Sequence, residues 1–173
     1  MKINYDPFPH IIVDSFFNRN EIEIVNKELN FLIKSEDTLQ VNLNNIYNND
    51  IFSDIIQIIN IKLFDKNFIN LIKEKHEYWM GFSKNLRSIT ELIVLDKNNK
   101  KDKFTFSNYF FGFKIYTIVS PDDFLGGDLV FPFNHFKIKN YHNRTIIIPG
   151  WVCDEIIPIK YGKCNFIKTY VFE

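Results

Sequence analysis

The chain has 173 residues, a mass of 20.7 kDa and a formal net charge of zero, from 21 basic and 21 acidic side chains. Hydrophobic residues make up 46% and charged residues 24%, proportions that are typical of globular proteins and exclude a disordered or fibrous chain. The charge balance gives no basic surface for nucleic acid or an anionic membrane, and no apolar run approaches the roughly 20 residues of a membrane span. We therefore expect one soluble domain over 1–173, with neither a nucleic-acid nor a membrane partner.

Residue usage is strongly skewed, with 27 Ile, 21 Asn and 18 Lys but only 3 Arg and no Ala. The abundant residues have AT-rich codons, so the bias indicates an AT-rich genome, such as that of some viruses, phages, bacteria or protists. Cys153 and Cys164 are too few for a disulfide framework and fit a reducing compartment. The N-terminus lacks the apolar core of a signal peptide. We expect a cytoplasmic or virion-associated protein that is not secreted through such a signal.

Helical patterns occupy the first half of the chain. Apolar residues recur at helical spacing over 20–34, which predicts an amphipathic helix with Asn20 as its N-cap. A second helical region runs from about 53 to 78, and the polar segment 65–67 divides it in two. Together these elements predict a mainly helical N-terminal layer over 1–80.

From residue 87 onward the pattern is that of strands. The segment 87–95 is rich in β-branched residues, which favour strands. Further short strands are expected at 104–109, 112–119, 128–132, 135–139, 144–148, 152–157 and 164–172. A spacing of about 8–12 residues between short strands is typical of a β-sandwich or barrel. Gly126, Gly127 and Asn143 stand where tight turns need a positive φ. We expect an α+β fold whose all-β core covers 87–173.

Two stretches carry a pattern that is also found in a known family. The first is an opening strand that runs into a helix over 7–17, PFPHIIVDSFF. The second, over 120–163, contains SPDDFLGGDLVFP, NRTIIIPG and IIPIKYGK. These stretches resemble the prolyl-4-hydroxylase-like branch of the Fe(II)/2-oxoglutarate dioxygenases. The resemblance implies a double-stranded β-helix (jelly-roll) core with N-terminal helices packed against it.

Catalysis in that family needs two His and one carboxylate on one side of an iron ion, with the other positions open to 2-oxoglutarate and dioxygen. A basic residue then pairs with the far carboxylate of 2-oxoglutarate. The family pattern places the His-x-Asp pair at Ser107 and Tyr109, the second His at Asp154 and the basic anchor at Cys164. All four positions are therefore replaced, and there is no His at all in 77–134. We expect no catalytic residues, no metal ligands and no cofactor.

Residues near the same positions could substitute for the missing ones. Lys163 and Lys168 are candidate anion anchors: Lys163 adjoins the anchor position but faces the opposite side of the strand, whereas Lys168 has the same parity as Cys164. Cys153, Asp154 and Cys164 could form an unusual soft metal site, although two lone cysteines in a β-core are more often small buried hydrophobes.

The histidines and aromatics have ordinary structural interpretations. His10 is expected to be structural, His76 to lie near a helix C-terminus, and His135 and His142 to lie in surface loops. An aromatic cluster occupies the stretch where the first two ligands should be, and it either packs the sheet or plugs a former cofactor pocket. Its members are Phe104, Phe106, Tyr109, Phe110, Phe111, Phe113 and Tyr116.

Three functions follow from these observations. The first is a catalytically inactive, prolyl-4-hydroxylase-like protein that acts as a binding, scaffold or structural-assembly module for protein partners. The second is an active hydroxylase that uses Fe(II) and 2-oxoglutarate through rewired ligands. The candidate ligands for such a site are His76, Asp102, His135, His142 and Asp154. The third is an unrelated jelly-roll domain of a carbohydrate-binding or capsid type. The sequence predicts no oligomeric state.

Overall fold

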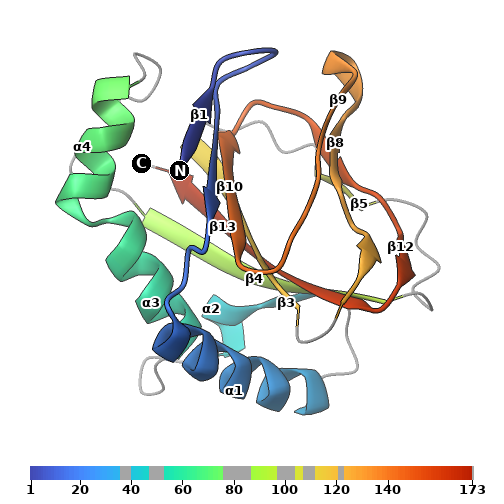
Figure 1. Cartoon of the computed structure of the whole chain (residues 1–173). Helices are drawn as coiled ribbons and strands as arrows, with labels where there is room; N and C mark the ends of the chain where they lie inside the picture. The colour runs from blue at the N-terminus through green and yellow to red at the C-terminus, as the bar shows by residue number, and fades with distance from the viewer. Residues whose placement is uncertain are drawn as a thin grey trace.

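The structure is a computed structural model, and it describes residues 1–35, 40–46, 53–75, 87–96, 104–106, 112–120 and 123–172. Two antiparallel sheets face each other, and helices cover the outer face of the larger one (Figure 1). The larger sheet has seven strands in the order β1 (Lys2–Asn4), β2 (His10–Asp14), β10 (Arg144–Pro149), β6 (Gly112–Val119), β13 (Lys163–Phe172), β4 (Arg87–Asp96) and β3 (Gln40–Asn42). The smaller sheet has four, in the order β5 (Phe104–Phe106), β11 (Asp154–Ile156), β8 (Leu129–Phe131) and β9 (Phe136–Ile138). A further short pair is formed by β12 (Ile159–Tyr161) and β7 (Leu125–Gly126).

The helices come from the N-terminal half of the chain. They are α1 (Arg19–Ser35), α2 (Leu43–Ile46), α3 (Asp54–Leu63) and α4 (Lys66–Lys75), and a 3₁₀ turn at Pro132–Asn134 joins β8 to β9. None of the helices in the described ranges is long and apolar enough to cross a membrane. The predicted helix over 20–34 is confirmed, as is the division of the second helical region near Asp65. The last residues of that region, 76–78, lie outside the described part of the chain.

Side chains alternate between the two faces of the central strands and so form two separate hydrophobic cores. On β6, Phe113 and Ile115 pack toward the helices, whereas Tyr116 and Ile118 pack between the sheets. Strand β13 alternates in the same way, with Phe166 inside and Ile167 on the helix side. Because β6 and β13 are central, both of their faces are buried. A charged residue at an inward position of either strand is therefore enclosed between the two sheets.

The predicted fold class, an α+β jelly roll with helices packed on it, is confirmed. Strands were predicted at 87–95 and 112–119, and β4 and β6 occupy these positions almost residue for residue. The opening strand predicted within 7–17 is present as β2, and β1 and β3, which were not predicted, also join the larger sheet. Strand β2 pairs with β10 over four residues, so the opening segment of the chain is part of the sheet that carries the later strands.

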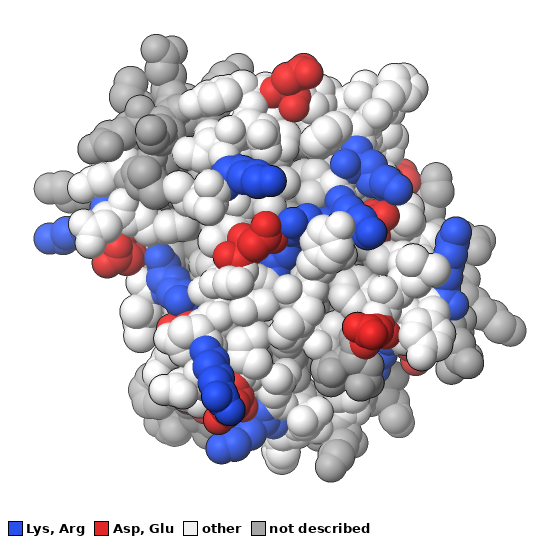
Figure 2. Space-filling model, in the orientation of Figure 1, with Lys and Arg blue, Asp and Glu red and all other residues white. Residues whose placement is uncertain are grey.

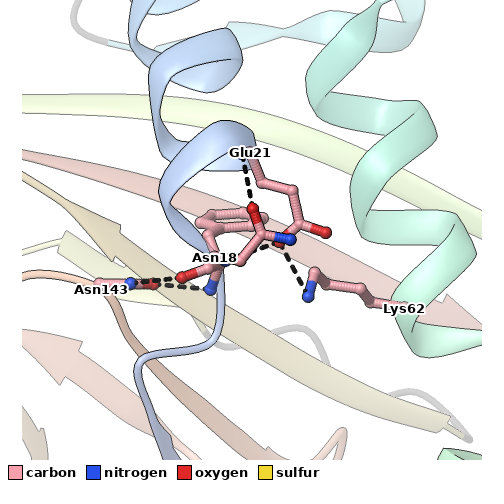
Figure 3. A network of polar contacts seen from close by, with 5 residues as sticks. Asn18, Glu21, Lys62 and Asn143 are labelled. Atoms are coloured by element: carbon pink, nitrogen blue, oxygen red, sulfur yellow. Dashed lines mark hydrogen bonds and ion pairs between the residues drawn. The ribbon is translucent and has the colours of Figure 1, made fainter.

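The start of α1 corrects one prediction. The N-cap is Asn18 and not Asn20, because the Glu21 amide donates to the Asn18 side chain at 3.0 Å and the Asn18 amide donates to the Glu21 carboxylate at 2.7 Å. This reciprocal arrangement is a capping box. Glu21 also pairs with Lys62 of α3 at 2.9 Å, so the same carboxylate holds two helices together (Figure 3). Glu21 is the acidic residue in the first turn of α1.

Asn143 ties the start of the helical layer to the sheet. Its side chain accepts from the Phe17 amide and donates to the Phe17 carbonyl, both at 2.8 Å, and its own φ is 59° (Figure 3). Asn tolerates this left-handed conformation better than most residues. Gly126 has φ 98°, and a Cβ there would collide with the Pro158 carbonyl. The positive φ values predicted at these two positions are confirmed.

Candidate functional site

The centre of the site is Asp154, which stands on β11 in the middle of the smaller sheet and is completely buried. Its carboxylate points at β6 of the larger sheet. Lys114 Nζ lies 2.5 Å from Asp154 Oδ1 and also donates to the Val152 carbonyl at 2.6 Å. The Tyr116 hydroxyl donates to the other carboxylate oxygen, Oδ2. Both oxygens of Asp154 are therefore bound by side chains of β6, a strand of the opposing sheet.

A second lysine lies beside this pair. Lys168 is completely buried on the inward face of β13, where it stands opposite Tyr116 on β6 and Glu91 on β4. Its Nζ lies 5.0 Å from the Tyr116 ring centroid and 4.6 Å from that of Tyr170. At both distances an aromatic ring attracts an amine that carries a proton. We call Lys114, Tyr116, Asp154, Lys168 and Tyr170 the inner cluster.

Burial sets the protonation of the inner cluster. It lowers the pKa of Lys168 to about 6; the Asp154 and Glu91 carboxylates oppose this shift and Lys114 adds to it. Burial also raises the pKa of Tyr116, and the adjacent Asp154 carboxylate raises it further. Burial also raises the pKa of Tyr170, and the Glu91 carboxylate makes the largest charge contribution to this shift. At neutral pH, Lys168 is thus mostly a neutral amine and both phenols keep their protons.

The structure brings two of the candidate residues, Asp154 and Lys168, into one cluster. Cys164 lies on the same face of β13 but in the apolar inner core, where burial raises the pKa of its thiol. Lys163 has the opposite parity from Lys168 and is partly exposed, as expected from strand alternation. Ser107 and Tyr109 lie outside the described residues.

The pairing of Lys114 with Asp154 was not predicted from the sequence, and Tyr116 was predicted only as a member of the aromatic cluster. A signal was present: β6 reads GFKIYTIV and is buried along nearly its whole length, so its one charged side chain has to meet a counter-charge inside. Of the predicted aromatic cluster, Phe113 packs toward the helices and Tyr116 inward. The members at 109–111 lie outside the described part of the chain.

The described residues do not fit an iron held by two His and a carboxylate. Within the described ranges, no three His, Cys, Asp or Glu side chains lie close enough to hold a metal ion together. The soft metal site considered for Cys153, Asp154 and Cys164 is therefore not formed. Asp154, the candidate ligand at the family's second His position, is already bound by Lys114 and Tyr116.

The described histidines lie elsewhere, as predicted. His10 is buried against the Phe8 and Phe136 rings, and its Nδ1 pairs with the Phe8 carbonyl at 2.9 Å. His135 and His142 are exposed, and His142 Nδ1 accepts from the Ser120 amide at 3.1 Å. Neither exposed histidine can be a ligand together with the fully buried Asp154 unless the fold rearranges. His76 and Asp102 lie outside the described residues.

Comparisons with known proteins identify the fold. No family model matches the sequence, and a search of curated proteins found no match either. Among solved structures, a truncated viral collagen prolyl hydroxylase from Paramecium Bursaria Chlorella virus-1 superposes with a TM-score of 0.66 at 15% identity, over 94% of this chain and 88% of that one. The 2-oxoglutarate complex of the same enzyme gives 0.66 at 13% identity, over 94% of both chains. A Pseudomonas putida prolyl-4-hydroxylase gives 0.63 at 8% identity, over 94% of this chain and 91% of that one.

These similarities cover nearly the whole of each chain, so they concern the complete fold and not one motif. The protein has the double-stranded β-helix fold of the Fe(II)/2-oxoglutarate dioxygenase superfamily. The solved structures that share this fold include prolyl hydroxylases of viral and bacterial origin. The resemblance predicted from 7–17 and 120–163 is confirmed at the level of the fold.

Proposed function

We propose that this protein is a catalytically inactive, prolyl-4-hydroxylase-like protein that acts as a binding, scaffold or assembly module for protein partners. The observation that carries the proposal is the state of Asp154. The family pattern places the second iron-binding His at this position, and here a carboxylate stands there with both oxygens bound by Lys114 and Tyr116.

This arrangement opposes metal binding for two reasons. A metal ion at Asp154 would have to break a buried ion pair, which leaves an uncompensated charge in the interior. It would also stand beside the Lys114 ammonium, and two like charges repel strongly where water is excluded. The Lys114 ammonium thus takes the place of a metal ion as the positive charge that faces Asp154. A fold shared with enzymes does not by itself confer their chemistry, which depends on the site.

Other features support a protein partner over nucleic acid. The net charge is zero, and on the face shown in Figure 2 basic and acidic side chains are interspersed without a single-sign patch. Nucleic-acid binding usually needs a basic stripe or patch. The chain is rich in residues with AT-rich codons, which supports a viral source. The viral origin of the collagen prolyl hydroxylase with the same fold supports it as well. In that setting we propose a virion component or an accessory subunit.

The alternative is an active Fe(II)/2-oxoglutarate hydroxylase with rewired ligands. The observation that favours it is the match to a viral prolyl hydroxylase solved with 2-oxoglutarate, over 94% of both chains. This alternative requires ligands from residues outside the described ranges together with a displaced Lys114.

A titration of anaerobically purified protein separates the two functions. Fe(II) or Mn(II) is added first and 2-oxoglutarate second, and heat and melting temperature are followed. A ligand present at 100 times its Kd stabilises the folded state by about 2.7 kcal/mol. For a domain of this size, that raises the melting temperature by roughly 5–10 °C. The proposal predicts no shift at millimolar ligand, whereas a shift that needs metal and 2-oxoglutarate together contradicts it and supports the hydroxylase.

A further inference from the structure

Lys168 is one of two lysines that are completely buried among the described residues, the other being Lys114. Its side chain is enclosed between the two sheets, with its amine near the faces of two tyrosine rings, Tyr116 and Tyr170. A lysine in such a place is stable as a neutral amine but costly as an ammonium ion, because the ion loses its hydration. Protonation of this amine therefore favours any conformation in which water reaches it.

The groups that face Lys168 are set by the strands around it. Across the larger sheet, β6 presents Lys114 and Tyr116, and β4 presents Glu91. The opposing smaller sheet presents Asp154 from β11. Tyr170 and Cys164 lie on the same face of β13 as Lys168 itself.

Asp154 and Lys114 form a neutral pair at 2.5 Å, and Glu91, which is partly exposed, is hydrogen-bonded to Tyr170. A proton added to Lys168 places a second ammonium beside Lys114 in an enclosed space. The Asp154 and Glu91 carboxylates attract that ammonium, but the hydration that it loses on burial outweighs their attraction. The smaller sheet is the layer that encloses it, since larger-sheet strands β6 and β4 are joined to β13 by continuous hydrogen-bonded ladders.

We propose that Lys168 forms a pH-sensitive latch between the two sheets, in which protonation of its amine favours a state where the smaller sheet moves away from β13 and water enters the inner face. This inference is independent of whether the protein binds iron. It makes access to the inner face, and to any partner or ligand that binds there, dependent on pH.

The size of the effect follows from linkage. An opened lysine has its ordinary pKa of 10.5, while burial holds the pKa of the closed one near 6. Between these two values opening takes up one proton, so the ratio of open to closed molecules rises about tenfold for each pH unit of acidification. Below about pH 6 both states are protonated and the ratio becomes constant.

The two cysteines of the chain report on this opening. Cys164 is completely buried on the inner face, whereas Cys153 is partly exposed next to Asp154. The ratio of their alkylation rates, measured by mass spectrometry, cancels most of the intrinsic pH dependence of thiol chemistry. We expect the Cys164-to-Cys153 ratio to rise about a hundredfold from pH 9 to pH 7 in the wild type. In Lys168→Met, where the titrating group is absent, the ratio should stay flat, and in Lys163→Met, on the opposite face of the same strand, it should follow the wild type.

Urea separates opening of the sheets from global unfolding. Global unfolding exposes the most surface, so about 1 M urea should increase the unfolded fraction fivefold or more. A local opening exposes less surface and responds more weakly to urea. We expect Cys164 alkylation in the wild type to rise by less than the globally unfolded fraction does. A flat ratio in the wild type, an unchanged slope in Lys168→Met, or a urea response equal to that of global unfolding would each overturn the latch. The urea measurement needs only the wild type and remains decisive if Lys168→Met does not fold.

Discussion

The buried pair between Lys114 and Asp154 makes the sharpest stability prediction. Asp154→Asn keeps the shape of the side chain and a hydrogen-bonding partner for Tyr116 but removes the charge that faces Lys114. Lys114 Nζ then retains the Val152 carbonyl and no counter-ion that the structure describes. Removal of one partner of a buried ion pair costs about 3–5 kcal/mol. For a domain of this length, that lowers the melting temperature by roughly 6–20 °C.

A matched set of variants isolates the charge pair. Asp14→Asn removes the partner of Arg144 from an exposed ion pair with a distance of 2.6 Å, and it should cost less than about 1 kcal/mol. The double variant Lys114→Met with Asp154→Leu removes both charges and fills the space with apolar atoms, so it should be more stable than Asp154→Asn. It should still be about 1–3 kcal/mol less stable than the wild type, because the Tyr116 hydroxyl and the Val152 carbonyl lose these hydrogen bonds. Urea unfolding followed by fluorescence measures all three. If Asp154→Asn costs no more than Asp14→Asn, Asp154 is not held by a buried ion pair and the account of the site is wrong.

Three further predictions concern pH, a turn and a helix terminus. Because the folded pKa of Lys168 is about 6 and the unfolded one 10.5, the unfolded state binds one more proton between these values, and stability should rise by about 1.36 kcal/mol per unit from pH 6.5 to 9. It should fall again above pH 10, because the two inner-cluster phenols have raised pKa values and ionise first in the unfolded state; urea unfolding across pH tests both limbs, and a flat profile contradicts them. Asn143→Ala loses two hydrogen bonds to Phe17 and places Ala at a φ of 59°, so it should lower the free energy of unfolding by about 2–4 kcal/mol. Asn143→Gly loses the same bonds but accepts this φ, so its loss should be about 1 kcal/mol smaller. Equal losses in the two variants would show that the conformation is not strained. Glu28→Ala removes the acceptor of the Ser53 hydroxyl and of the Ile55 amide at the start of α3, and calorimetry should show a loss of about 1–3 kcal/mol, against no loss for the neighbouring Lys27→Ala.

The sequence predicted strands best where they are long and apolar. The bounds of β4 and β6 follow from runs of β-branched and aromatic residues between polar turns. The two-residue strand β7 and the three-residue strand β3 left no such pattern, because their pairing is determined by partners far away in the chain. The cap of α1 was missed by two residues, since Asn18 and Asn20 are both good caps and only tertiary contacts decide between them.

The candidate site was predictable only in part. Parity along β13 placed Lys168 on the same face as Cys164, because strand alternation is a local rule. The contact between Lys114 and Asp154 was not predictable, because it joins two sheets across 40 residues of sequence and depends on how the sheets are stacked. Burial of Asp154 was equally hidden, since a three-residue strand such as β11 carries no periodicity of its own.

The central claim is that the Asp154 carboxylate is occupied by Lys114 and Tyr116 and does not bind a metal ion. Paramagnetic broadening by Mn(II) tests this claim at the site itself, because a bound Mn(II) ion relaxes nearby methyl and amide signals. With 2-oxoglutarate present, we predict no selective broadening at Ile156 and Tyr116, which flank Asp154, compared with the distant Leu29 of α1. Broadening confined to the residues around Asp154 and dependent on 2-oxoglutarate would contradict the claim and identify the protein as a metal-binding member of its fold.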